Sequence, residues 1–148
     1  MEIEILILQS DNLNELHELI TVFETVFEME NFKRPGQAHL QNLLNREHFF
    51  AVVAKNGNKI IGGLTVYILG QYYSEKPLAY IYDLAVLEDY QRKGVGGKLV
   101  EFTNEYCRQN GFEETFVQAD KVDDYAIDFY RSTKPSGEEQ VVHFSYRL

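Results

Sequence analysis

A stretch rich in glycine and basic residues, residues 91–98, stands between an apolar run and a helical pattern; it reads Gln91-Arg92-Lys93-Gly94-Val95-Gly96-Gly97-Lys98. Glycines let the backbone approach an anion closely, and the N–H groups at a helix start, together with the helix dipole, attract phosphate oxygens. Arg92 and Lys93 add positive charge to the same place. The stretch, here called the glycine-rich loop, therefore predicts a phosphate-binding site.

Two common phosphate-binding loops do not fit this stretch. A Walker A loop needs a glycine five positions before Gly97 and a serine or threonine after Lys98, but Arg92 and Leu99 occupy those positions. A dinucleotide-binding loop needs a third glycine where Leu99 stands. Nucleoside triphosphates and dinucleotides are therefore excluded as the expected ligands, and a glycine-rich turn without a ligand is the simplest remaining alternative.

Asp83 is the one charged residue in the apolar run Leu78–Val86. A carboxylate in a central strand is costly to bury unless it has a partner or a function. It could bind an ammonium group and accept its proton, because only a free amine is a nucleophile. The alternative is a structural aspartate paired with an arginine or with backbone N–H groups.

Three further carboxylates gather in a short segment of the chain: Asp120, Asp123 and Asp124. Closely placed carboxylates favour polycationic ligands through complementary charge. Asp123 or Asp124 could instead cap the helix that follows them. We therefore expect Asp120 above all to contact a substrate.

The elements that position these residues follow from hydrophobic periodicity and turn signals. In chain order the sequence predicts strand 2–8, helix 13–27, a short helix around 40–44, strands 49–55, 59–69 and 78–86, helix 94–110, strand 115–119, helix 124–132 and strand 140–146. Asn12 and Glu15 fit a capping box at the first helix. This order predicts an α/β fold, with one mixed sheet and helices on its faces.

The whole chain has the size and composition of one globular domain, residues 1–148. No apolar stretch or leader pattern indicates a membrane span or secretion, so a cytoplasmic protein without membrane partners is expected. The excess of 23 acidic over 14 basic residues disfavours nucleic acid. Cys107 stands alone, and no histidine spacing suggests a metal, so neither a metal nor a disulfide is expected.

The glycine-rich loop has the pattern Q/R-x-x-G-x-G/A, and through it the chain resembles the GNAT superfamily of N-acetyltransferases. Within that superfamily it is similar to the aminoglycoside 3-N-acetyltransferases. That similarity is carried by Tyr80–Val86, by Val117–Asp120, and by Asp123-Asp124 leading to Phe129-Tyr130. The resemblance covers most of the chain. It departs after Tyr130, where the common Gly-Phe ending is absent.

The resemblance implies a mostly antiparallel mixed sheet that splays between its fourth and fifth strands, where the cofactor acetyl-CoA enters. The glycine-rich loop, residues 91–98, would bind the pyrophosphate of coenzyme A. The backbone of Leu84, Ala85 and Val86 would form hydrogen bonds with its pantetheine arm. The N–H of Leu84 would stabilise the oxyanion. Tyr130, which by spacing alone would be a core residue, would protonate the departing thiolate.

The resemblance also implies the acceptor site and the reaction. Tyr82, Asp83 and the carboxylates at 120, 123 and 124 would bind a primary amine of an aminoglycoside-like polycation, as in antibiotic resistance enzymes. The amine would attack directly, because Cys107 has no partner for a covalent route. A polyamine or peptide amine, or a non-catalytic acyl-CoA sensor, remain alternatives. The last expected strand could pair with its twin in a homodimer.

Overall fold

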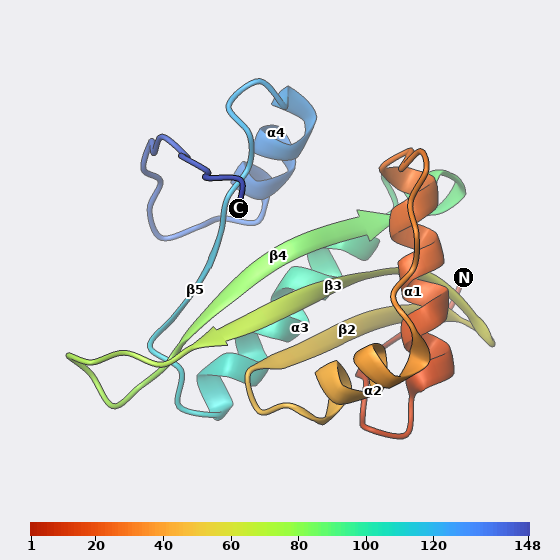
Figure 1. Cartoon of the computed structure of the whole chain (residues 1–148). Coiled ribbons are helices and arrows are strands. Elements are labelled where there is room, and N and C mark those ends of the chain that lie inside the picture. The colour runs from red at the N-terminus through yellow and green to blue at the C-terminus, as the bar shows by residue number, and fades with distance from the viewer. The chain divides into compact units, whose positions relative to one another are not determined.

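The computed structural model describes residues 1–148, which fall into two compact units, 1–118 and 119–148. The first unit contains a five-stranded sheet and most of the helices (Figure 1). Its elements are β1 Ile3–Ile7, α1 Leu13–Val26, α2 Gln37–Asn45, β2 Phe49–Asn56, β3 Lys59–Leu69, β4 Leu78–Val86, the 3₁₀ turn η1 Glu88–Tyr90, α3 Val95–Gln109 and β5 Glu114–Val117. They follow the predicted order.

The strands lie in sequence order, β1-β2-β3-β4-β5. The first three pairings are antiparallel and the pairing of β4 with β5 is parallel. Hairpins connect β2 to β3 and β3 to β4, whereas α3 crosses over between β4 and β5. The mixed, mostly antiparallel sheet that the resemblance implied is therefore confirmed.

Helices cover both faces of this sheet, α1 and α2 on one face and α3 on the other (Figure 1). Leu19 of α1 lies so close to β3 that a Cβ atom on Gly63 would come within 2.5 Å of the leucine Cδ1. On the other face Leu99 and Cys107 of α3 are buried against the sheet. Burial of these apolar side chains is the main favourable term that holds helices and sheet together.

The second unit contains one helix, α4 Asp124–Ser132. The Asp123 side chain caps this helix by accepting a hydrogen bond from the N–H of Ala126 at 3.0 Å. Arg131 near its end binds Glu138 through two nitrogens, at 2.9 and 2.8 Å. Residues after Ser132 form no further helix or strand.

Two predictions about elements are wrong. Residues 140–146 are not a strand, because a strand needs a ladder partner and this segment pairs with none of the five strands. The capping box at α1 is also absent, because the Asn12 side chain accepts from the N–H of Gln9 at 2.7 Å instead of capping the helix. None of the helices is long and apolar enough to cross a membrane.

Candidate active site

The glycine-rich loop turns the chain from β4 into α3. Gly94 is the N-cap of α3 with a left-handed φ of 83°, and Arg92 also has a left-handed φ, of 60°. The first N–H groups of a helix have no intrahelical acceptor, and α3 has no side-chain cap. A Cβ atom on Gly97 would meet no other atom within 4 Å. The N-terminus of α3 therefore offers free donors and open space, which suit a phosphate group.

Side chains fix the loop and give it positive charge. Gln91 donates from Nε2 to the carbonyl oxygen of Val86 at 2.7 Å, so the loop is fastened to the end of β4. The ammonium groups of Lys59 and Lys93 lie 5.8 and 5.9 Å from the centre of the Tyr90 ring. In a chain with a net charge of -9, this concentration of cations beside a helix start favours an anionic ligand.

Strand β4 continues beyond the end of its neighbour β5, whose last residue, Val117, pairs with Ile81. The N–H of Asp83 donates to Thr65 Oγ1 at 3.3 Å and that of Leu87 to the Ile61 oxygen at 2.8 Å, so both point to β3. N–H directions alternate along a strand. The N–H groups of Leu84 and Val86 therefore point to the opposite edge, where β5 no longer pairs with β4. This divergence agrees with the expected splay.

Asp83 lies in a β-bulge, where Tyr82 and Asp83 together face Thr65 of β3. A bulge re-aims side chains and is common beside active sites. The Asp83 side chain is partly buried, and this burial raises the pKa of its carboxyl group above the usual value of 3.8. No arginine or lysine forms an ion pair with it. A carboxyl group with a raised pKa is a better proton acceptor than an ordinary aspartate.

The Asp83 carboxyl group borders a cavity of about 470 Å³ on the face of the sheet that carries α1 and α2. The other walls come from α1, the segment that follows it, and α2; they are Ile20, Phe23, Phe27, Met29, Phe32, Pro35, His39, Leu40 and Leu43. Most of these side chains are apolar. The cavity thus combines an apolar wall with one acidic group, an arrangement typical of sites for small organic ligands.

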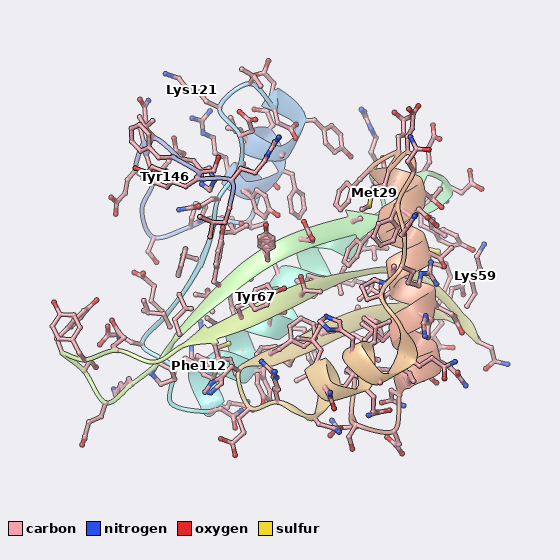
Figure 2. All side chains as sticks on the ribbon, viewed as in Figure 1. Met29, Lys59, Tyr67, Phe112, Lys121 and Tyr146 are labelled. Carbon is pink, nitrogen blue, oxygen red and sulfur yellow. The ribbon has the colours of Figure 1, made fainter.

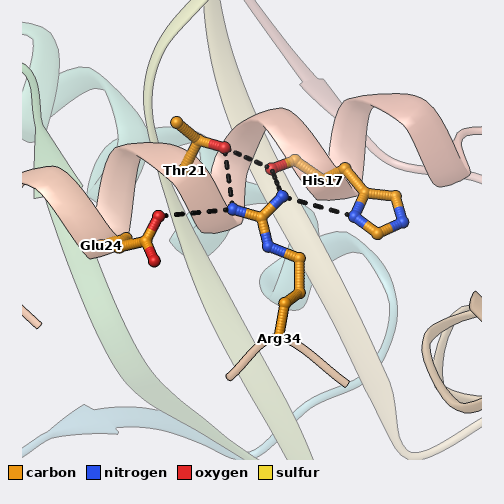
Figure 3. A network of polar contacts seen from close by, with 4 residues as sticks. All are labelled: His17, Thr21, Glu24 and Arg34. Carbon is orange, nitrogen blue, oxygen red and sulfur yellow. Dashed lines mark hydrogen bonds and ion pairs between the residues drawn. The ribbon is translucent and has the colours of Figure 1, made fainter. Parts of the chain in front are cut away.

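Arg34 holds the cavity wall after α1 against that helix (Figure 3). It donates to Thr21 Oγ1 at 2.9 Å and to the His17 carbonyl oxygen at 3.2 Å, and it lies 3.7 Å from the Glu24 carboxylate. Several bonds from one guanidinium give a more defined geometry than a single surface ion pair. Arg34 therefore positions the segment that contains Met29 and Phe32.

Tyrosines surround Asp83 on the sheet itself. The pKa values of Tyr67 and Tyr80 are raised, first by burial and then by the charges of Tyr82 and Asp83. Tyr67 lies on the part of the sheet that α1 leaves uncovered (Figure 2). The carboxyl group therefore stands between the apolar cavity and a group of tyrosine rings.

The remaining predicted residues belong to the second unit. Asp123 caps α4, which is the structural alternative that the sequence left open, and Asp120 accepts from the N–H of Val122 at 3.3 Å. Asp124 lies exposed in the first turn of α4. Tyr130 is partly buried and its ring contacts that of Phe129 at 5.0 Å. Its role as an acid stays a prediction.

The sequence analysis did not identify the residues of the cavity wall, nor Arg34, which holds that wall in place, nor Tyr67. The phenylalanines at positions 23, 27 and 32 were a signal, because aromatic residues continue past the end of α1. Tyr67 gave no signal, since it is one of many apolar or aromatic residues in its strand. Its place beside Asp83 depends on the register of β3 and β4.

Comparison with known proteins agrees with this geometry. Residues 13–133 match the Acetyltransferase (GNAT) family. The chain is similar to the aminoglycoside acetyltransferase meta-AAC0020 from an uncultured soil metagenomic sample, solved in complex with sisomicin: the two are 60% identical over 99% of this chain and 96% of that chain, with a TM-score of 0.98. A second structure of that protein is a complex with trehalose.

Two further relatives are more distant. The aminoglycoside acetyltransferase HMB0005, also from an uncultured soil metagenomic sample, is 30% identical over 100% of this chain and 99% of that chain, with a TM-score of 0.92. The histone acetyltransferase GCN5 of Debaryomyces hansenii is 23% identical over 88% of this chain, and the chain spans only 27% of its length.

Strand β4 continues beyond β5 and leads to a helix start without a side-chain cap. Together with a family match over most of the chain, this arrangement defines an acyltransferase. The chain belongs to the GNAT acetyltransferase family. The predicted superfamily, fold and enzyme class are confirmed.

Proposed function

We propose that this chain is an acetyl-CoA-dependent N-acetyltransferase that acetylates a primary amine of an aminoglycoside. The observation that carries the proposal is the position of Asp83, an unpaired carboxyl group beside both an open strand edge and a cavity. The proposal is also supported by the relative that is 60% identical, an aminoglycoside acetyltransferase whose structure contains sisomicin.

The donor site is proposed at the glycine-rich loop and the free edge of β4. The N–H groups at the start of α3, with Arg92 and Lys93, suit a pyrophosphate, and the Leu84–Val86 backbone suits an amide-containing arm. Acetyl-CoA, when bound there, supplies an activated acetyl group. The N–H of Leu84 is directed so that it can donate to a carbonyl oxygen and stabilise the negative charge that develops on it.

The acceptor site is proposed at Tyr82 and Asp83. The sequence resemblance alone adds Asp120, Asp123 and Asp124 as further proposed substrate contacts. Asp83 accepts a proton from the substrate ammonium, directly or through water, and the free amine then attacks the acetyl carbonyl carbon. The carbon–sulfur bond breaks as the carbon–nitrogen bond forms, and the nitrogen loses its second proton to water to give the neutral amide. By the sequence resemblance, Tyr130 is proposed to donate its proton to the departing sulfur, so that coenzyme A leaves as a thiol and the hydroxyl is later reprotonated from solvent.

The amine that is acetylated is proposed to be that at position 3 of the aminoglycoside. This assignment rests on the sequence similarity of Tyr80–Val86 and Val117–Asp120 to enzymes with that regiochemistry. Two-dimensional NMR of the purified product identifies the modified amine. Acetylation at another position would retain the mechanism and reject this assignment.

The proposal is tested by measuring acceptor-dependent release of coenzyme A with a thiol reagent. The panel comprises sisomicin, gentamicin, spermidine and a short lysine peptide, each with acetyl-CoA. Turnover on the aminoglycosides is expected, with loss in Asp83→Asn and retention in Asp89→Asn, a matched change at an exposed carboxylate. Turnover on spermidine or the peptide alone would reject the aminoglycoside, and donor binding without turnover would favour an acyl-CoA sensor.

We also propose that the chain forms a homodimer through residues 140–146. Val142, Phe144 and Tyr146 alternate along this segment and are 76%, 76% and 85% exposed. Alternating apolar residues are typical of a strand with one buried face. The segment has no ladder partner within the chain and is not a strand there, and a second copy would supply that partner. Pairing of the segment with its twin would bury these side chains.

A further inference from the structure

Aromatic rings form a continuous row across four strands of the sheet. Phe49 contacts Tyr67 at 5.5 Å between ring centroids, Tyr67 contacts Tyr82 at 5.5 Å, and Tyr82 contacts Tyr80 at 5.6 Å. Tyr80 stacks on Phe116 of β5 at 4.6 Å. The rings come from β2, β3, β4 and β5, so the row, here called the aromatic row, crosses the sheet from one strand to the next.

The aromatic row begins under the helices and is most exposed in its middle part. Phe49 belongs to the core beneath α1 and α2, with 5% of its surface exposed, whereas Tyr67 and Tyr82 are 38% and 53% exposed. Single exposed aromatic residues are ordinary, but adjacent ones on a rigid sheet commonly mark a binding surface. Because the rings hold one another nearly perpendicular, at 87° and 85°, the surface is preorganised.

The same surface carries a negative charge. Asp83 follows Tyr82 in the bulge, and its charge contributes to the raised pKa values of Tyr67 and Tyr80, so the carboxyl group lies within electrostatic reach of both rings. Aromatic faces attract cations as well as apolar C–H groups. A ligand that suits both features has a cationic amine on a ring with an apolar face.

We infer that the aromatic row is a subsite for the sugar ring of an amino-sugar acceptor, whose C–H face packs on Tyr67 and Tyr82 while its ammonium group meets Asp83. The inference rests on the proposed function and extends it by naming the groups that recognise the sugar. A linear polyamine carries the charge but has no ring face to place on the row.

The kinetic test compares Tyr67→Ala and Tyr82→Ala with Tyr67→Phe, Tyr82→Phe and Tyr72→Ala. Tyr72 is 98% exposed in the loop between β3 and β4 and serves as the matched control. Loss of one ring should raise the KM for sisomicin up to about tenfold with little change in kcat or in the KM for acetyl-CoA. The phenylalanine variants and Tyr72→Ala should resemble the unmodified enzyme.

Spermidine separates recognition of the sugar from recognition of charge. If the KM for spermidine rises as much as that for sisomicin, the rings recognise only the cation and the inference is wrong. An unchanged KM for sisomicin in both alanine variants, with thermal stability retained, would also overturn it.

A binding experiment is independent of turnover. Saturation-transfer difference NMR with trehalose, a disaccharide without an amine, should show transfer to the ring C–H protons with the unmodified protein and with Tyr72→Ala, and a reduced signal with Tyr82→Ala. An equal signal in all three proteins would reject the aromatic row as a sugar subsite. If trehalose binds as expected but no aminoglycoside is acetylated, the subsite stands and the proposed acceptor fails.

Discussion

The carboxyl group of Asp83 combines partial burial, a raised pKa and the lack of a basic partner. A structural aspartate would be expected to hold a salt bridge or several donors, because burial of an unpaired charge costs stability. The energetic cost at this position is therefore consistent with a proton acceptor. In the proposed mechanism its neighbours Tyr82 and Leu84 contact the acceptor and the donor, respectively.

Asp83→Asn should lower kcat by about 10²–10⁴-fold, because general base catalysis contributes that much. The base acts when deprotonated, so activity falls as the pH falls through its pKa. Because burial raises this pKa, the acidic limb of kcat/KM should lie above the usual value of 3.8. Steady-state rates measured from pH 4 to 9 check both points.

Asp89→Asn removes a carboxylate of the exposed η1 turn and should leave the profile unchanged. If Asp83→Asn retains most of its activity across the pH range, Asp83 is not the base.

Individual residues were predictable where their chemistry shows in the local pattern. Asp83 stood out because its strand is otherwise apolar, and Gly94 because a helix start follows it. Tyr67 and Arg34 could not be identified, because their contacts join residues far apart in the chain: Arg34 bonds to Thr21, and Tyr67 meets Tyr82 only through strand register. Such contacts depend on the folded sheet and not on spacing.

At the scale of elements, close contact between α1 and β3 depends on Gly63. A Cβ atom there would lie 2.5 Å from Leu19 Cδ1 and 2.7 Å from the Val52 carbonyl oxygen. Gly63→Ala should therefore destabilise the protein by about 1–3 kcal/mol, the usual cost of overpacking. Urea denaturation measures the change. Gly70→Ala, where a Cβ atom meets nothing within 4 Å, is the control and should change stability little.

The glycines of the loop should respond to alanine in opposite directions. Gly94 has a left-handed φ of 83°, so Gly94→Ala should cost about 1–2 kcal/mol. Gly97 lies inside α3 with open space around it, so Gly97→Ala should stabilise the protein by a few tenths to about 1 kcal/mol. Parallel urea denaturation of the two variants tests this difference. Equal effects would mean that the turn at Gly94 is not set by its left-handed backbone.

Most elements could be predicted because their periodicity and turn signals agree. The strand 78–86 and the helix 124–132 have the predicted bounds. The bulge in β4 could not be predicted, since Leu78–Val86 is apolar on both faces and gives no alternation to reveal an extra residue. The register shift follows from pairing with β3.

For the whole molecule, the central expectation is a dimer that depends on residues 140–146. Phe144→Glu places a charge on the apolar face of that segment and should convert a dimer to a monomer, because a buried unpaired charge is costly. Size-exclusion chromatography with light scattering gives the mass. Ser145→Glu, on the opposite face of an extended chain, should remain dimeric. A monomeric unmodified protein would reject the proposal.

The wrong strand at 140–146 shows where sequence patterns stop being sufficient. Alternation of apolar residues describes which face a segment would bury, but a strand exists only when another strand bonds to it. A helix satisfies its own backbone, which is why α4 was found from the same part of the chain. The prediction of one domain over residues 1–148 stays a prediction.

The buried position of Cys107 in α3 makes its thiol a probe for the rate of unfolding. The thiol is 2% exposed, and burial raises its pKa to about 11, so in the folded protein it should resist the reagent that detects free coenzyme A. It is also the only cysteine in the chain. Its alkylation rate, read by mass spectrometry, should therefore track opening of the core and rise steeply in Gly63→Ala. The rate at which Cys107 is labelled thus reports on unfolding without an added probe. Fast labelling under native conditions would show that α3 opens locally.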